Sequence, residues 1–299
     1  MKLLCPACDI ITDTKHISKY SNKDKIFDNK NLYQCQDCKL VFIDPMPSME
    51  ELDFYYKNIW ITYKEAELTY QIQAEERFKY LLRHIDMRRC RAVLDVGSGH
   101  GYLYESFKKN GFMNIDFHAT DPNPDNLHRL KSRGINAYAD LKEIEEREFD
   151  IVIIASVLEH VTAPYLFILS VLEYLKEGGY IFIDLPDRDD TFKPIFEPHV
   201  AFYSAESLIC LVNKLGLEVI HLTGYGRRRS ELIAELHGKK NILTLAKNMI
   251  GGIAKKIKGS VSRENELRNL YKQYKFDEEG IDRWWIRTIL RKPLRDTSK

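Results

Sequence analysis

Three glycines stand at alternate positions after a short apolar run, and they mark the part of the sequence best suited to hold a ligand. They are Gly97, Gly99 and Gly101, and Asp95 precedes the first by two residues. Glycine lets a ligand approach the main chain closely, and a glycine loop between a strand and a helix N-terminus forms a cradle. The third glycine comes one residue too early for the dinucleotide pattern G-x-G-x-x-G. A carboxylate at Asp95 suits an ammonium group better than a pyrophosphate, so a ligand with an amino group is expected.

Glu159 and His160 form a second group that could do chemistry. They follow the apolar run from Phe149 to Ala155, which predicts a strand buried on both faces. Ligands of open α/β sheets bind at the carboxyl ends of such strands. A neutral imidazole there can take a proton from a hydroxyl nucleophile near neutral pH. The alternative is a structural pair that shapes the ligand pocket, because group transfer can depend on proximity more than on a base.

Four of the six cysteines form two C-x-x-C pairs near the N-terminus, namely Cys5, Cys8, Cys35 and Cys38. Two such knuckles make a tetrahedral zinc site, and four thiolates close it, so the zinc is expected to be structural. A redox pair is the alternative, but neither pair has the strand-to-helix context of a thioredoxin motif.

The glycine loop resembles motif I of the class I S-adenosylmethionine-dependent methyltransferases. Later segments match that family in order and spacing, and the segment from Ser156 to Val161 is close to the "LEH" signature of many small-molecule methyltransferases. A glycine turn in some other α/β domain is the alternative for the loop alone. The resemblance implies a Rossmann-like α/β fold with a seven-stranded methyltransferase sheet. The cysteine pairs add a small N-terminal zinc ribbon, and the chain departs from the family in a helical insertion before the last strand. The ribbon segment 32–42 also resembles a bacterial methyltransferase group, although Lys39 replaces the usual glycine.

The resemblance implies S-adenosylmethionine as cofactor and assigns residues to it. Asp121 ends the second strand, where an acid can accept hydrogen bonds from both ribose hydroxyls. Asp140 takes the adenine amino group in this family, and the amide of the next residue takes a ring nitrogen. The expected cofactor contacts are Asp95, Gly97, Ser98, Gly99, Gly101, Asp121, Pro122, Asp140, Leu141 and Ser156.

A segment after the fifth strand resembles sugar C-methyltransferases that carry N-terminal zinc ribbons. His199 and Ser204 match that group, whereas Phe196 and Pro198 stand where it has tyrosine and glutamate. The departure weakens the case for C-methylation, because removing a carbon-bound proton needs more help than deprotonating a hydroxyl. The candidate catalytic residues are Glu159, His160 and His199.

The predicted organisation has five parts: a zinc ribbon over 1–47, a helical lid or linker over 48–90, the cofactor-binding domain over 91–226, a basic helical insertion over 227–283, and the last strand and tail over 284–299. Tyr55, Tyr56 and Arg77 of the lid are candidates to reach the methionine carboxylate, against the alternative of a surface position. Loss of metal is expected to unfold the ribbon before it affects a distant Rossmann core.

Composition limits the partners. The chain has 299 residues with 45 basic and 44 acidic side chains, and this balance argues against a dedicated nucleic-acid binder. No secretory signal is visible and no apolar run approaches the ~18 residues of a membrane span, so a cytoplasmic location is expected. Within the insertion, 241–258 predicts an amphipathic helix. It either packs on the domain or lies at the inner membrane surface, where it would contact a lipid-linked acceptor.

The preferred hypothesis is a methyltransferase acting on a hydroxyl of a small molecule, sugar or glycan precursor. An rRNA or tRNA methyltransferase that binds RNA through its ribbon is the first alternative, and the triplet 227–229 of arginines keeps it open. A non-catalytic scaffold or regulatory protein that binds S-adenosylmethionine is the second.

Overall fold

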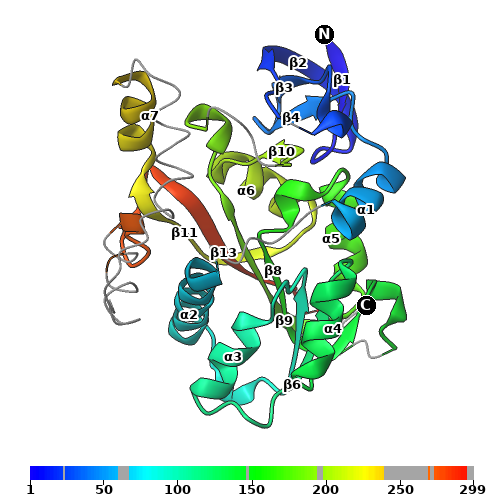
Figure 1. The fold of residues 1–299 in the computed structure, drawn as a ribbon, viewed down its shortest axis with the longest axis vertical. Coiled ribbons are helices and arrows are strands. Elements are labelled where there is room, and N and C mark those ends of the chain that lie inside the picture. Colours follow the sequence, from blue (N-terminus) through cyan, green and yellow to red (C-terminus); the bar gives the residue numbers. More distant parts are fainter. Residues whose placement is uncertain are drawn as a thin grey trace, which may run out of the picture.

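The computed structural model is a mixed α/β structure with one large sheet and one small sheet (Figure 1). The segment expected to form an amphipathic helix, 241–258, lies outside the described residues. Among the described residues, no helix is both long enough and apolar enough to cross a bilayer. The structure describes residues 1–22, 24–59, 67–145, 148–193, 198–238, 269 and 273–294.

The large sheet has the expected methyltransferase architecture, in the order β12-β11-β13-β9-β8-β5-β6-β7. The five strands from β9 to β7 are parallel, and β13 and β11 are antiparallel to their neighbours. Seven strands were expected, and the described residues add β12, a strand of two residues at the edge. The strands are β5 Ala92–Val96, β6 Asp116–Thr120, β7 Asn136–Tyr138, β8 Phe149–Ala155, β9 Leu175–Pro186, β11 Glu218–Arg228, β12 Glu279–Gly280 and β13 Arg283–Arg291.

Helices cover both faces of this sheet (Figure 1). α2 and α3 pack on one face through Phe78 and Phe107, whose rings are 4.8 Å apart. α5 and α6 pack on the other face through Ile168 and Leu208. Leu82 of α2 is 42% exposed. The helices are α1 Met49–Asn58, α2 Glu67–His84, α3 Tyr102–Lys109, α4 Pro124–Ser132, α5 Pro164–Leu172, α6 Ala205–Lys214 and α7 Arg229–Gly238.

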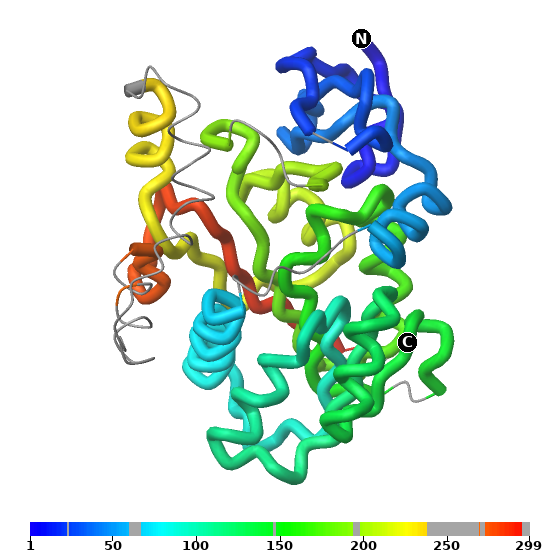
Figure 2. The backbone as a smooth tube through the Cα atoms, in the orientation of Figure 1, coloured from blue at the N-terminus to red at the C-terminus, as the bar shows by residue number. Residues whose placement is uncertain are grey.

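The N-terminal ribbon forms the small sheet, in the order β1-β2-β3-β4-β10. Its last strand, β10, comes from the segment between β9 and α6, far outside residues 1–47. Ala201 and Phe202 of β10 pair with Phe42 and Val41 of β4. In Figure 2 the blue ribbon lies beside the yellow-green tube that carries β10 and α6. The strands are β1 Lys2–Cys5, β2 Ile10–Lys19, β3 Asn31–Cys35, β4 Val41–Asp44 and β10 Ala201–Phe202.

The ribbon therefore belongs to the hydrophobic core of the catalytic domain, and the expectation of a distant ribbon was wrong. Its four cysteines are buried in one cluster with Leu158, Tyr203 and Leu208. The hydroxyl of Tyr20 donates to the carbonyl of His199 at 2.8 Å, and the ammonium of Lys214 donates to the carbonyl of Cys8. Sequence spacing could not show this arrangement, because β10 contributes only two residues to the ribbon sheet.

Candidate active site

The glycine loop leaves β5 at the carboxyl edge of the sheet, with its amides tied to the neighbouring strand. Gly97 and Ser98 donate their N–H groups to the carbonyl of Thr120, at 2.8 and 3.0 Å. A Cβ added to Gly97 would lie 2.5 Å from a methyl carbon of Val157, so this glycine is needed for packing. A Cβ on Gly99 would meet nothing within 4 Å. Gly99 is thus the place where a ligand can approach the main chain, which fits S-adenosylmethionine.

Two buried carboxyl groups flank the loop. Asp95 is 4% exposed, and its Oδ2 accepts from the hydroxyl of Ser98 at 2.7 Å. Burial raises the pKa of Asp95 to about 7, and a bound ammonium group would favour its ionised form. Asp121 accepts from the N–H of Gly99 at 2.8 Å and from the N–H of Asn123 at 2.9 Å. The side chain of Asn126 donates to it at 3.2 Å, which leaves about one of its four lone-pair sites for a ligand.

The remaining expected cofactor residues lie at the same edge, on either side of the loop. Asp140 caps the short 3-10 helix Leu141–Glu143 and accepts from the N–H of Lys142 at 2.9 Å. Pro122 directly follows Asp121 and is exposed. Ser156 directly follows β8 with φ of +58°, a conformation that non-glycine residues seldom adopt. The sheet therefore brings together the residues assigned to ribose, adenine and methionine.

Arg77 of α2 reaches this edge, as the sequence suggested, and it contacts the expected Ser156 together with Asp184, which the sequence analysis did not single out. Its Nη2 donates to Ser156 Oγ and to Asp184 Oδ1, both at 2.8 Å. Tyr225 also donates to Asp184 Oδ1, at 3.0 Å. Arg287 lies across the ring of Tyr225, and its Nε is 3.9 Å from Asp184 Oδ2. Asp184 and Arg287 sit inside apolar strands, so no local pattern marks them as functional.

Glu159, His160 and His199 come together beyond the end of β8. Each offers one ligand atom, and these atoms lie within 4.8 Å of one another. The two imidazole rings are 4.8 Å apart, and the N–H of Val200 donates to the carbonyl of Glu159 at 2.8 Å. Glu159 is 2% exposed, and burial raises its pKa to about 7. Its Oε2 is buried with no hydrogen-bond partner in the described part of the chain.

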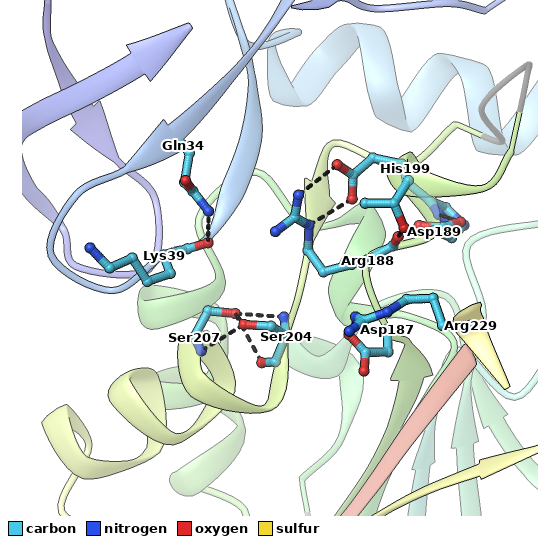
Figure 3. A network of polar contacts seen from close by, with 11 residues as sticks. Gln34, Lys39, Asp187, Arg188, Asp189, His199, Ser204, Ser207 and Arg229 are labelled. Atoms are coloured by element: carbon cyan, nitrogen blue, oxygen red, sulfur yellow. Dashed lines mark hydrogen bonds and ion pairs between the residues drawn. The ribbon is translucent and has the colours of Figure 1, made fainter. Parts of the chain in front are cut away.

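Residues 187–190, which follow β9, include the carboxylate of Asp189 that contacts His199 (Figure 3). His199 Nδ1 lies 2.9 Å from Asp189 Oδ2, and both side chains are 2% exposed. Lys193 Nζ lies 2.9 Å from the same oxygen. Next to this pair, Arg229 Nη1 donates to Asp187 Oδ1 at 2.7 Å. Asp189 was not predicted, because ten residues separate it from His199 and nothing in the spacing indicates contact.

His160 is held from the other side by α1. The hydroxyl of Tyr56 lies 2.8 Å from His160 Nδ1, and this nitrogen is 3.1 Å from the carbonyl of Pro198. Tyr56 therefore reaches the candidate active site, and the residue that it contacts there is His160. Tyr55 does not, since its hydroxyl donates to Asp24 at 2.7 Å and its ring packs in the ribbon. Tyr55 was one of the candidates to reach the methionine carboxylate, and its hydroxyl contacts Asp24 instead.

The four ribbon cysteines fit a zinc ion. Cys5 Sγ is 3.6 Å from Cys38 Sγ, and Cys8 Sγ is 3.9 Å from Cys35 Sγ. A tetrahedral site with Zn–S bonds of about 2.3 Å places its sulfurs about 3.8 Å apart. Lys39, which follows the second knuckle, has φ of +63° and so takes the left-handed conformation that glycine favours.

Comparisons with known proteins agree with this fold. A family profile described as a methyltransferase domain matches residues 70–222, just over half of the chain. The ubiquinone biosynthesis O-methyltransferase of Candida albicans is 38% identical over 109 residues, which cover 32% of this chain and 33% of that protein. A ubiquinone biosynthesis O-methyltransferase of Aliivibrio fischeri is 31% identical over 145 residues, covering 46% of this chain and 60% of that protein.

The chain thus spans between a third and three fifths of these relatives. Among solved structures, the plantazolicin methyltransferase BpumL in complex with S-adenosylhomocysteine superposes with a TM-score of 0.46 at 16% identity, covering 83% of this chain and 91% of that one. The profile match covers the glycine loop and the parallel strands described above. The chain belongs to the methyltransferase domain family, as a class I S-adenosylmethionine-dependent methyltransferase with an N-terminal four-cysteine ribbon.

Proposed function

We propose that this protein transfers the methyl group of S-adenosylmethionine to a hydroxyl of a small molecule, sugar or glycan precursor. The observation that carries the proposal is the placement of two groups at one edge of the sheet. The glycine loop with Asp95 and Asp121 lies beside the cluster of Glu159, His160 and His199, because β5 and β8 are neighbours. The relatives named O-methyltransferases support a small-molecule acceptor.

Each of the proposed cofactor-binding residues would contact a different part of S-adenosylmethionine. Asp95 would hold the methionine ammonium, and Arg77 would hold the methionine carboxylate. Asp121 would accept from one ribose hydroxyl at its remaining lone-pair site, while Asp140 and the amide of Leu141 would bind the adenine ring. S-adenosylmethionine, when bound, supplies an electrophilic methyl group next to the acceptor.

The acceptor side consists of the buried carboxyl and the two imidazoles. The acceptor hydroxyl would lie against Glu159, His160 and His199, which hold it in line with the sulfonium methyl. The nitrogen of a neutral imidazole can take the hydroxyl proton. Asp189 fixes the orientation of His199, and Tyr56 with the Pro198 carbonyl fixes that of His160.

The arginine triplet 227–229 was the feature that supported the RNA methyltransferase alternative, and the structure weakens this support. In the arginine triplet, Arg227 Nη2 donates to Glu235 Oε1 at 2.5 Å, and Arg229 donates to Asp187. Two of the three cations are therefore neutralised within the chain, and they offer little to a phosphate backbone.

The test is the formation of S-adenosylhomocysteine from S-adenosylmethionine in the presence of a panel of hydroxylated small molecules and nucleotide sugars. We expect His160→Ala and His199→Ala to lower turnover more than cofactor affinity, because neither residue touches the glycine loop. Equal losses in both quantities would place these histidines in the wall of the cofactor pocket. If no hydroxyl acceptor gives turnover while an RNA substrate does, the proposed acceptor class is wrong.

A further inference from the structure

We infer that Glu159, His160 and His199 form a second metal site, which binds one divalent cation on the acceptor side of the active site. The set is two imidazoles and one carboxylate, a combination that binds divalent ions such as Zn²⁺, Mn²⁺ and Fe²⁺. It is separate from the four-cysteine ribbon, whose thiolates select zinc. The role of the ion rests on the proposed function, whereas its binding does not.

The distances allow coordination after a small contraction. One ligand atom from each residue lies within 4.8 Å of the other two. A common point then lies within about 2.8 Å of all three atoms, against metal–ligand bonds of about 2.0–2.2 Å. Shifts of under about 1 Å in three side chains would close the site around an ion.

The buried carboxyl of Glu159 is an independent sign that a cation belongs here. The side chain is 2% exposed, and its Oε2 has no hydrogen-bond partner among the described residues. A buried carboxyl oxygen without a donor is costly, and a metal ion would satisfy it. Glu159 lies on the short 3-10 helix Leu158–His160, so it reaches the same point as the adjacent His160.

Both histidines are held in the way that metal-binding histidines usually are. A ligating imidazole donates its second ring N–H to a carboxylate or a backbone carbonyl, which fixes the tautomer and the ring orientation. His199 Nδ1 is 2.9 Å from Asp189 Oδ2, and His160 Nδ1 is 3.1 Å from the carbonyl of Pro198. Rings held through Nδ1 coordinate a metal through Nε2. Lys193 Nζ lies 2.9 Å from the same oxygen of Asp189.

Three protein ligands leave coordination positions open for the acceptor. An acceptor hydroxyl bound there loses its proton to solvent more readily, because the cation stabilises the alkoxide. The oxygen lone pair then forms the O–C bond as the C–S bond of the cofactor breaks, and the sulfur keeps its electron pair as S-adenosylhomocysteine leaves. The charge of the ion thus promotes the loss of the proton from the acceptor hydroxyl. In the absence of an ion, this role is assigned to a histidine ring nitrogen.

The experiment is a titration of the zinc-loaded protein with Mn²⁺, followed by electron paramagnetic resonance. Mn²⁺ prefers oxygen and imidazole ligands, so the thiolate ribbon does not compete for it. We expect one Mn²⁺ per chain, with ¹⁴N couplings from imidazole in spin-echo spectra of the unmutated protein. A free Mn²⁺ signal that excess protein leaves unchanged, or a bound ion without nitrogen couplings, would overturn the inference.

Mn²⁺ binding by substituted proteins identifies which residues are ligands of the ion. Glu159→Gln and His199→Ala should abolish Mn²⁺ binding, and Asp189→Asn should weaken it by about 10- to 100-fold, because it orients a ligand without touching the ion. His128→Ala is the matched control, since His128 is an exposed histidine on α4. Equal binding in all four variants would contradict the assignment. The spectrum of the unmutated protein decides the matter if a buried variant fails to fold.

The same samples separate this inference from the proposed function. If methyl transfer continues undiminished in a chelator that leaves the ribbon zinc in place, the metal inference fails and the function stands. If Mn²⁺ binds through imidazole but S-adenosylmethionine does not bind, the second metal site is supported and the proposed function fails.

Discussion

Replacing Tyr20 with phenylalanine tests how the ribbon holds the candidate active site. Tyr20 is 8% exposed, and its hydroxyl donates to the buried carbonyl of His199 at 2.8 Å. Its ring packs against Phe27 and Phe202, with centroids 5.4 and 6.3 Å away. Tyr20→Phe keeps these ring contacts and removes only the oxygen. Leaving the His199 carbonyl buried without this donor should lower the free energy of unfolding by about 1–3 kcal/mol.

The same variant should separate turnover from cofactor binding. A looser His199 main chain alters the cluster that faces the acceptor, whereas Asp95 lies on β5 and Asp121 directly follows β6. We therefore expect lower turnover with little change in S-adenosylmethionine affinity, measured by urea unfolding, isothermal titration and initial rates. Tyr33→Phe is the control, because Tyr33 lies in the same ribbon sheet with its ring edge-on to His16. Unchanged stability and turnover in Tyr20→Phe would show that the ribbon does not position His199.

Three further predictions concern the ribbon, the buried carboxyl and the loop. Cys38→Ser should lose zinc, by elemental analysis, and should lower the melting temperature of the whole chain, because the cysteines share the catalytic core; a separate low-temperature ribbon transition would contradict this. Burial raises the pKa of Asp95 from 3.8 to about 7, so its contribution to stability is complete below pH 3.8 and is lost as pH rises through 7. In urea unfolding, the Asp95→Asn variant should accordingly lose less free energy of unfolding over this pH range than the unmutated protein. Parallel pH profiles of the two proteins would refute this prediction. Both glycines have positive φ, so alanine strains the backbone at each, and Gly97→Ala should destabilise the fold more than Gly99→Ala because its Cβ also lies 2.5 Å from Val157; equal losses of melting temperature in the two variants would contradict the distinction.

The parts of the fold that the sequence predicts are those with a local physical signature. The apolar run Phe149–Ala155 forms β8 with those bounds, because a parallel central strand is buried on both faces. The helices that begin after Ser48 and Ser204 have capping boxes, each of which needs only two residues three apart. The glycine loop likewise adopts positive φ where its spacing indicates.

The parts that the sequence misses depend on contacts between distant residues. β10 joins the ribbon sheet through two residues, too few to show any periodicity. Asp189 reaches His199 across a loop, and Tyr56 reaches His160 from a helix about a hundred residues earlier. Arg287 is buried beside Asp184, and nothing in the local sequence of β13 distinguishes it from the other arginines of that strand.

Isothermal titration with S-adenosylmethionine tests the central claim most directly, namely that the glycine loop and its flanking acids bind this cofactor. The unmutated protein should bind one molecule per chain. Asp121→Ala should weaken binding by roughly 1.5–3 kcal/mol, about ten- to 150-fold, because it removes a charged hydrogen-bond acceptor. Asp125→Ala, an exposed acid at the start of α4, should leave the affinity unchanged. No binding by the unmutated protein, or equal affinity in the Asp121 and Asp125 variants, would contradict the placement of the cofactor.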